Sequence, residues 1–374
     1  MLTFEKMYSM GHEEVIFLSE PSCGLKAIIA IHDTTLGPAL GGTRMWPYAS
    51  EAEAMEDVLR LSKGMTYKAA VSGLNLGGGK AVIIGDPKVD KSEALFRAYG
   101  RYIESLNGRY ITAEDVNISV EDIDNVYTET NYVCGIAKAS GGSGNPAPYT
   151  ALGVFRGMEA SATQIWGSRQ SIKDKVVGIQ GVGSVGIELA KLVDEVGGRL
   201  IFTDISEENI SRMREKFPNA EYIAPDNFYG ANMDIYAPCA LGATVNDETI
   251  PQLKCKIVNG AANNQLAENR HGQILKDKGI LYSPDYLINA GGLMNVSIEF
   301  EGWNDYKSRR MIDTIYDTTL RIFKMSEERN IPVNQATDAL AEERLEAMKN
   351  IQTTYLGVGS DHRFPGTKVR NNKL

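Results

Sequence analysis

The alternation of apolar and polar positions in the first part of the chain predicts an α/β fold. Ser50 and Glu53 have the spacing of a helix capping box, and apolar side chains recur after them at helical intervals. The expected elements are strands at residues 26–32, 81–85 and 110–113 and helices at about 51–67 and 95–106. The last strand carries Glu114 and Asp115 to its carboxyl end.

A segment rich in glycine, serine and proline at residues 139–148 predicts a linker, after which strands and helices alternate regularly. The expected strands are 176–180, 200–203, 234–238, 256–259 and 280–283, and the expected helices include 150–166 and 333–348. Such alternation is typical of a parallel, doubly wound sheet. We therefore predict two α/β domains, residues 1–140 and 141–332, with residues 333–374 packing back near the first.

A dinucleotide-binding fingerprint follows the first strand of the second domain. The sequence Gly-Val-Gly-Ser-Val-Gly lies between that strand and a helical pattern, and an aspartate follows 18 positions after its last glycine, at the end of the next strand. This context predicts a Rossmann domain that binds NAD, because the aspartate would bind the ribose hydroxyls and repel a 2′-phosphate. The expected contacts are Gly181, Gly183, Ser184, Val185, Gly186 and Asp204.

Composition narrows the class of protein further. A chain of 374 residues favours two domains, and a net charge of −9 argues against a nucleic-acid partner. No run is apolar enough for a membrane span or a signal core. The four cysteines are far apart, which indicates free thiols and a cytoplasmic location, and the four histidines show no metal-ligand spacing, so we expect no metal site.

Two lysines, Lys68 and Lys80, bracket a segment that contains three consecutive glycines at 77–79. We predict a loop that approaches a ligand closely, with a lysine held beside it. Leu74 and Ala81 stand where a phosphate-binding P-loop needs glycine and a hydroxyl residue. A desolvated lysine near a second cation loses proton affinity and can serve as a base. The alternative is a surface loop with a solvated lysine.

Motifs in both halves resemble the Glu/Leu/Phe/Val amino-acid dehydrogenases, most closely the leucine dehydrogenases among them. The motifs are residues 31–44, 63–68, 77–80, 238–242, 260–265 and 284–292, which together extend over nearly the whole chain in the family's order. The resemblance implies a substrate and oligomerisation domain, a Rossmann NAD-binding domain and an active site in the cleft between them. It implies reversible, NAD-dependent deamination of branched-chain L-amino acids to 2-oxo acids and ammonia.

The resemblance also implies the roles of individual residues. Lys68 matches the lysine that binds the substrate carboxylate, Lys80 the general base, and Asp115 the acid that handles protons at the amino group. Asn263 and Thr150 match residues beside the nicotinamide. The positions that match the family's substrate pocket are Leu40, Gly41, Ala113, Leu293 and Val296. The apolar members of this set could equally be ordinary core residues.

One departure from the leucine dehydrogenase pattern lies next to the candidate acid. Asn117 and Ile118 stand where those enzymes carry glycine and threonine, and a tryptophan-specific relative looks similar there. An aromatic amino-acid dehydrogenase is therefore the alternative, and a catalytically silent NAD-binding protein is a third possibility. The resemblance further implies a homo-oligomer, specifically an octamer, whose only other partners are the amino acid, the 2-oxo acid and ammonium.

Overall fold

The computed structural model describes residues 3–350, which form two compact units. The first comprises residues 3–145, 296–304 and 341–350, and the second comprises Pro146–Asn295 and Asp305–Leu340. The predicted tail beyond residue 350 lies outside the described residues. The domain limits at 140/141 and 332/333 stay predictions.

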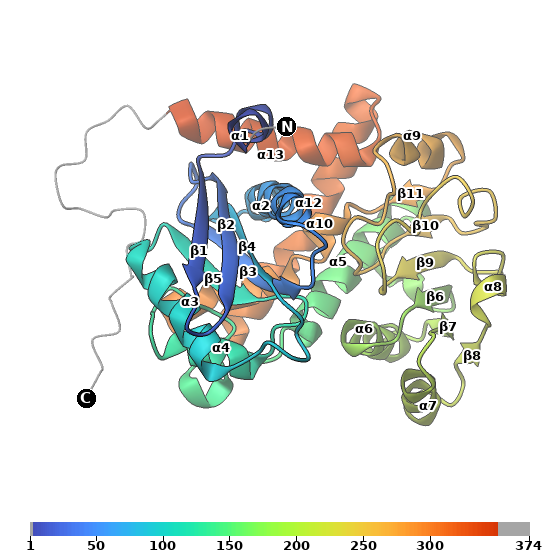
Figure 1. Cartoon of the computed structure of the whole chain (residues 1–374). Coiled ribbons are helices and arrows are strands. Elements are labelled where there is room, and N and C mark those ends of the chain that lie inside the picture. Colours follow the sequence, from blue (N-terminus) through green and yellow to red (C-terminus); the bar gives the residue numbers. More distant parts are fainter. Residues whose placement is uncertain (1–2, 351–374) are drawn as a thin grey trace. The chain divides into compact units, whose positions relative to one another are not determined.

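The first unit is built around a five-stranded mixed sheet in the order β1-β2-β4-β3-β5 (Figure 1). Its strands are β1 (Glu14–Glu20), β2 (Leu25–Asp33), β3 (Ala39–Trp46), β4 (Gly77–Ile84) and β5 (Tyr110–Glu114). Its helices are α1 (Thr3–Met10), α2 (Glu51–Val71), α3 (Glu93–Ser105), α4 (Val120–Tyr127) and the short η1 (Lys138–Ser140) and η3 (Ile298–Glu301). The expected strands and helices of this unit are present, together with β1, β3, α1 and α4, which we did not predict.

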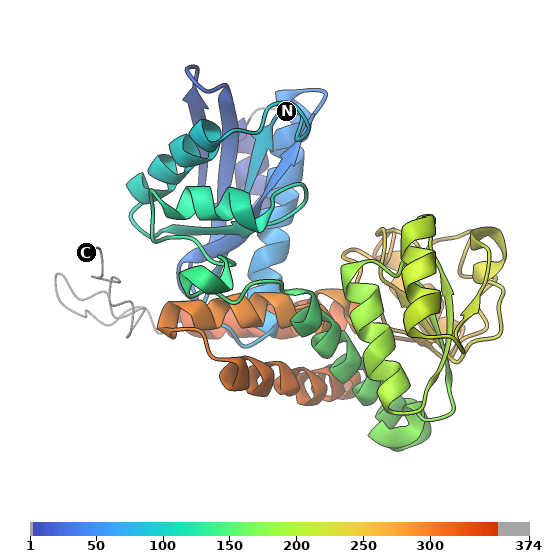
Figure 2. The ribbon, with the colours of Figure 1, turned by 90° about the horizontal axis from the view of Figure 1, so that it is seen from below.

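Two apolar layers cover the two faces of this sheet. On one face, residues of α3 and α4 such as Phe96 and Ile123 pack with Ile29 and Ile83 of the sheet. On the other face, Val58 and its neighbours on α2 pack against β2 and β4. Figure 2 shows the helices on opposite sides of the strands. The middle of the sheet is thus shielded from water on both faces, which is where parallel strand pairs normally occur.

The prediction of a loop at the glycine run is wrong. Gly77–Gly79 begin β4, which pairs with β3 on one side and β2 on the other. All three glycines are buried, and backbone hydrogen bonds to both neighbouring strands hold them extended. The glycines serve close packing here and not flexibility, as the contacts of Gly78 described below demonstrate. The helix before them, α2, ends at Val71, four residues later than expected.

The second unit contains a parallel six-stranded sheet in the order β11-β10-β9-β6-β7-β8. Its strands are β6 (Val176–Gln180), β7 (Arg199–Thr203), β8 (Glu221–Tyr222), β9 (Ile235–Pro238), β10 (Ile257–Val258) and β11 (Leu281–Tyr282). Its helices are α5 (Ala147–Trp166), η2 (Arg169–Ile172), α6 (Ser184–Glu195), α7 (Glu207–Lys216), α8 (Pro225–Phe228), α9 (Arg270–Asp277), α10 (Asp285–Ile288) and α12 (Asp305–Arg329). The strand order reverses between β6 and β9, as in a doubly wound nucleotide-binding fold.

Two further helices each contain one of the points where the chain passes between the units. They are α11 (Gly291–Ser297) and α13 (Val333–Asn350). The final predicted helix corresponds to α13, and the long α12 before it was not predicted. None of the helices within residues 3–350 is long and apolar enough to cross a membrane.

Candidate functional site

Several of the residues predicted for the site lie on one face of the first unit's sheet. Leu40 pairs with Gly78 on β4 and with Ile111 on β5. Side chains alternate between faces along a strand, and directly paired residues share a face. The alternation therefore assigns one face to Leu40 and Gly42 of β3, Gly78 and Lys80 of β4, and Ala113 of β5, with Asp115 next in the same phase. Strand order thus brings together the predicted base, the predicted acid and the apolar side chains of Leu40, Ile111 and Ala113.

Helix α2 packs directly on this face. A Cβ atom on Gly78 would lie 2.1 Å from Thr66 Oγ1 and 2.2 Å from Thr66 N, so only glycine permits this approach of helix to strand. Lys68 follows two residues later in the last turn of α2 and is half-buried. The glycine run thereby fixes the distance between the helix that carries Lys68 and the strand that carries Lys80.

Lys80 and Asp115 form a largely buried ion pair. Lys80 Nζ lies 2.8 Å from Asp115 Oδ2, and the lysine is only 5% exposed. The two residues come from β4 and from the end of β5, with β3 between them. A Cβ on Gly42 of β3 would stand 2.9 Å from Asp115 Cβ, so the glycine leaves the space that the aspartate occupies. The predicted base and acid are therefore in direct contact.

A third charged residue, Arg44 of β3, joins this pair. Its Nε lies 3.3 Å from the same Oδ2 of Asp115. Burial alone would raise the pKa of Asp115, but Lys80 and Arg44 outweigh it and hold the pKa of that carboxyl below its ordinary value. Asp115 is therefore ionised at neutral pH. Arg44 was not among the predicted site residues, because only the fold brings it to the aspartate.

Glu114 was a competitor for the role of the acid, and its surroundings separate it from Asp115. It pairs with Thr43 across the strands and so belongs to the opposite face in the alternation. Burial, then Asp115, then Glu299 raise the pKa of Glu114 to about 7. The Glu299 carboxylate itself accepts backbone hydrogen bonds from Gly135 at 3.0 Å and Ser143 at 2.7 Å. Adjacent carboxyls thus have pKa values displaced in opposite directions.

Asn117, the departure from the family's pattern, fits its position without distorting the site. Its φ of 61° is left-handed, a conformation that glycine adopts freely and asparagine better than most other residues. Its side-chain amide donates to the Met45 carbonyl at 3.1 Å, and the side chain is on the exposed side of the turn. Ile118 is buried in the apolar layer beneath α3 and α4. Both residues therefore contribute to the structure around β3 and β5 and not to the face that carries Lys80.

The remaining predicted substrate residues are distributed between the units. Leu40, Ala113 and Val296 are buried in the first unit, and Leu293 is buried in the second. Gly41 lies on the other face of β3 from Leu40, where a Cβ would come within 1.7 Å of the Gly79 carbonyl oxygen. The Gly41 carbonyl accepts a hydrogen bond from the Tyr110 hydroxyl at 2.5 Å. Gly41 thus contributes to the packing of β3 against β4.

The fingerprint of the second unit has the geometry that a dinucleotide requires. Gly181 has a φ of 92°, and a Cβ there would lie 2.6 Å from Ala240 Cβ. A Cβ on Gly186 would lie 2.0 Å from the Gly181 carbonyl oxygen, so the helix can approach the strand only at glycine. Gly183 differs from both, since a Cβ there would meet nothing within 4 Å. It caps α6, and Ser184 and Val185 form the first turn of that helix. The main chain at the N-terminus of α6, the positive end of the helix dipole, is unobstructed and can accommodate a pyrophosphate.

Asp204 stands at the end of the next strand, beside this turn. Its Oδ2 accepts from the Val182 amide at 2.8 Å, and its Oδ1 accepts from the Ser206 amide at 2.9 Å. Asn209 Nδ2 donates a further bond to Oδ2 at 3.3 Å. These bonds orient the carboxylate, and Oδ1 retains a lone pair for a ribose hydroxyl. The residues of this unit therefore fit an adenine dinucleotide.

Asn263 and Thr150, the residues predicted beside the nicotinamide, also belong to the second unit. Asn289 Nδ2 donates to the Ala261 carbonyl at 3.1 Å and to Asn263 Oδ1 at 2.7 Å. Because a backbone carbonyl can only accept, this fixes the amide orientations and turns the exposed Asn263 so that its NH₂ group can donate elsewhere. Asn289 is a supporting residue that the sequence left unassigned. Thr150 lies near the start of α5, with its hydroxyl donating to the Pro146 carbonyl at 3.2 Å.

One cluster in the described chain brings a histidine near carboxylates, which the sequence spacing did not indicate. Asp247, Glu268 and His271 have potential ligand atoms within 4.8 Å of one another. The Arg270 guanidinium, however, bonds both carboxylates, at 2.8 Å to Asp247 and 3.0 Å to Glu268. A fixed cation already compensates the two negative charges, so the cluster is accounted for as an ion-pair network.

Comparisons with known proteins match each half of the chain to one domain of the same family. Residues 12–132 match the family model "Glu/Leu/Phe/Val dehydrogenase, dimerisation domain", and residues 141–352 match "Glutamate/Leucine/Phenylalanine/Valine dehydrogenase". Leucine dehydrogenase of Bacillus cereus is 55% identical over 96% of this chain and 97% of its own. Phenylalanine dehydrogenase of Thermoactinomyces intermedius is 47% identical over 94% of this chain and 96% of its own.

A solved structure extends the likeness to three dimensions. The crystal structure of L-tryptophan dehydrogenase from Nostoc punctiforme superposes with a TM-score of 0.81 at 46% identity, and the match covers 93% of this chain and all of that one. Sequence and fold thus agree over nearly the full length, and the chain belongs to the Glu/Leu/Phe/Val dehydrogenase family.

Proposed function

We propose that this protein is an NAD-dependent L-amino-acid dehydrogenase that converts L-leucine, and also isoleucine and valine, to the 2-oxo acid, ammonia and NADH in a reversible reaction. The observation that carries the proposal is the buried Lys80–Asp115 pair, which shares a sheet face with the apolar Leu40 and Ala113. The identity of 55% to a leucine dehydrogenase over nearly the whole chain supports the branched-chain substrate.

The charged residues fit the proton transfers of oxidative deamination. Lys68 would hold the substrate α-carboxylate, and the ionised Asp115 would accept a proton from the α-ammonium group. Lys80, neutral at this stage, would then remove a proton from the water that attacks the imino carbon and return it to the nitrogen as ammonia leaves. The hydroxyl proton of the collapsing intermediate and the proton held by Asp115 would pass to solvent. When bound, NAD accepts the hydride from the α-carbon. The fingerprint residues and Asp204 would hold the cofactor, with Asn263 and Thr150 at its carboxamide.

The apolar positions favour an apolar substrate side chain. Leu40, Ala113 and Val296 are buried, as is Leu293 in the second unit, and none of them offers a charge to a side-chain carboxylate. Glutamate is therefore disfavoured. One methylene changes binding by only about 1–3 kcal/mol, so activity on leucine, isoleucine and valine should overlap.

The first experiment is a set of initial rates of NAD reduction, at mildly alkaline pH, with L-leucine, isoleucine, valine, phenylalanine, tryptophan and glutamate. The highest kcat/KM for a branched-chain substrate would support the proposal. A higher value for tryptophan or phenylalanine would retain the chemistry and reassign the substrate. Tight NADH binding without turnover on any substrate would refute the proposed reaction.

We also propose a cytoplasmic homo-oligomer, specifically an octamer. The match of residues 12–132 to a dimerisation domain supports self-association, and the octamer rests on the family resemblance. Light scattering that gives the mass of eight 41.0-kDa chains would support the octamer, and a smaller mass would correct it.

A further inference from the structure

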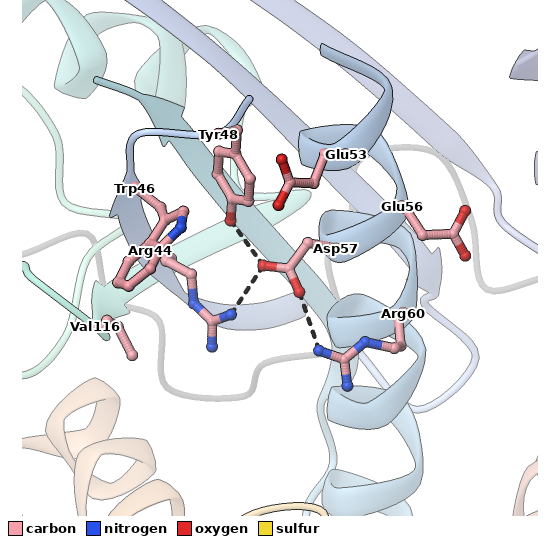
Figure 3. Close-up of a pocket in the computed structure, with 8 residues that line it drawn as sticks. All are labelled: Arg44, Trp46, Tyr48, Glu53, Glu56, Asp57, Arg60 and Val116. Atoms are coloured by element: carbon pink, nitrogen blue, oxygen red, sulfur yellow. Dashed lines mark hydrogen bonds and ion pairs between the residues drawn. The ribbon is translucent and has the colours of Figure 1, made fainter. Parts of the chain in front are cut away.

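Arg44 bridges two carboxylates that come from different elements. Its Nη1 lies 2.8 Å from Asp57 Oδ2 on α2, and its Nε lies 3.3 Å from Asp115 Oδ2 after β5. Figure 3 shows the guanidinium beside Asp57. Both residues line a cavity of about 450 Å³. The cavity is lined by Arg44, Trp46, Tyr48, Glu53, Glu56, Asp57, Arg60 and Val116.

Asp57 is itself held by three donors. Its Oδ2 accepts from the Tyr48 hydroxyl at 2.7 Å as well as from Arg44, and its Oδ1 accepts from Arg60 at 3.0 Å (Figure 3). A carboxylate with this many donors has little freedom to rotate. The anchored Asp57 therefore fixes one edge of the Arg44 guanidinium, and the planar group directs Nε towards Asp115.

Arg44 and Lys80 bond the same oxygen of Asp115. Lys80 Nζ is 2.8 Å and Arg44 Nε is 3.3 Å from Oδ2. Both cations therefore constrain the rotation of the carboxylate and direct Oδ1 away from themselves. A fixed carboxylate needs less reorganisation when it accepts a proton from a substrate amine.

We propose that Arg44, oriented by Asp57, is a positioning residue for the reaction: it holds Asp115 ionised and in place while Lys80 gives up and regains its proton. This inference rests on the proposed function, because it assigns Asp115 the role of proton acceptor. Lys80 cannot serve as the constant counter-ion of Asp115, since a base is neutral for part of the cycle. Arg44 remains charged throughout, and so supplies the permanent positive charge.

The charged groups around Asp115 determine whether its pKa should rise or fall in each variant. Lys80 from β4 and Arg44 from β3 lower the pKa of Asp115 against the effect of its burial, and Glu114 precedes it on β5. Asp57 on α2 forms an ion pair with Arg44, and the negative charge of Glu299 raises the pKa of Glu114. Removal of Arg44 leaves burial less opposed, so the Asp115 pKa should rise. Removal of the Asp57 charge should lower it.

The test is the pH dependence of kcat/KM for L-leucine in Arg44→Ala, Arg44→Lys and Asp57→Asn. Both Asp115 and the base Lys80 must be unprotonated, so the acidic limb steepens where Asp115 also becomes protonated. We expect this steeper part to begin about one pH unit higher in Arg44→Ala, which is roughly a tenfold loss of kcat/KM there. Arg44→Lys should move it less, because lysine keeps the charge but cannot span both carboxylates. Asp57→Asn removes the negative charge but keeps a side-chain oxygen that can accept from Arg44, so it should move the limb in the opposite direction. General damage to the fold would not reverse the sign.

Chemical rescue makes the test specific. The cavity should admit guanidinium ions to the space left in Arg44→Ala, so millimolar guanidinium should restore the limb, and urea, a neutral molecule of the same shape, should not. Equal effects of guanidinium and urea, an unshifted limb in Arg44→Ala, or an upward shift in Asp57→Asn would each overturn the inference. An active wild-type enzyme with any of these results refutes the role of Arg44 alone. A wild-type enzyme inactive on every amino acid refutes the proposed function as well.

Discussion

Gly78 of the first unit and Gly183 of the second serve opposite purposes at the two candidate sites. In the first unit, a Cβ on Gly78 would lie 2.2 Å from the backbone nitrogen of Thr66, so the glycine allows two elements of the protein to touch. In the second unit, a Cβ on Gly183 would meet nothing within 4 Å, so the glycine leaves backbone open at the start of α6. One glycine brings charged side chains together, and the other exposes main chain.

The two glycines meet different requirements. One helps to hold charged side chains in fixed positions, and the other gives a ligand access to the main chain. The first site needs Lys68, Lys80 and Asp115 at fixed positions, and rigid packing of helix on strand provides that. The second site needs unobstructed N–H groups at a helix end, and packing there would hinder the ligand. A single added methyl group should therefore harm folding at Gly78 and cofactor binding at Gly183.

The largest expected effect comes from removal of the base. Lys80→Ala should lower kcat by a factor on the order of 10³ or more, because no other group would take the proton from the attacking water. Binding of NADH, which depends on the second unit, should be nearly unchanged by fluorescence titration. Lys88→Ala, at an exposed lysine beyond β4, is the matched control and should retain full activity. Substantial turnover by Lys80→Ala would refute the assignment of Lys80 as the base.

The next effect concerns packing in the first unit. Gly78→Ala should destabilise the protein by about 3 kcal/mol, because the new Cβ would collide with the backbone of α2 and not only with a movable side chain. Gly64→Ala on the same helix is the control, since a Cβ there meets nothing within 4 Å and alanine should stabilise a helix by about 0.5–1 kcal/mol. Urea denaturation of both variants measures the difference. Equal stability of the two would show that α2 can move away from β4.

The dinucleotide fingerprint and the glycine run at 77–79 show what the sequence could and could not predict. The fingerprint was interpretable because strand, glycines, helix and Asp204 follow one another within 30 residues, so local spacing describes the site. Gly77–Gly79 were misinterpreted because their environment comes from β2, β3 and α2, which no local pattern specifies. The glycines then resemble a loop.

The Lys80–Asp115 contact likewise depends on strand order. Both residues were proposed from the resemblance to a family, but their meeting requires β3 to lie between β4 and β5 with a glycine at position 42. Arg44 escaped notice for the same reason, because its two carboxylate partners belong to α2 and to the turn after β5. Asn117 was recognised as unusual, yet only its φ of 61° and its bond to Met45 explain why it is accommodated.

The third effect is an acid sensitivity located in the first unit. His32 is buried, with Nδ1 2.8 Å from Thr66 Oγ1 and its ring 4.8 Å from that of His12. Burial first, then His12, with a further contribution from Lys63, lower the pKa of His32 to about 4, against the opposing effects of the Met10 carbonyl and Asp33. Thr66 is the residue on which Gly78 packs, so this histidine supports the same helix–strand contact.

The sign of the pH effect follows from these values. The unfolded chain binds a proton at His32 below about pH 6.5, whereas the folded chain does so only below about 4. The contribution to stability is thus complete above pH 6.5 and is lost as the pH falls towards 4, by about 3 kcal/mol in total. Urea midpoints between pH 7 and pH 4 should fall less steeply in His32→Gln than in the wild type, after correction for the lower starting stability. An unchanged slope would mean that other groups cause the loss.

The smallest effect tests the open glycine of the second unit. Gly183→Ala should raise the Kd of NADH about tenfold, because the added methyl group projects over the helix end where the pyrophosphate would approach the backbone. The urea midpoint should stay at the wild-type value, since the methyl group contacts no other part of the protein. Gly78→Ala should show the reverse. Its stability should fall, but the molecules that remain folded should still bind NADH, because the cofactor domain is unchanged. Loss of stability without loss of affinity in Gly183→Ala would remove the distinction between the two glycines, since both would then serve packing.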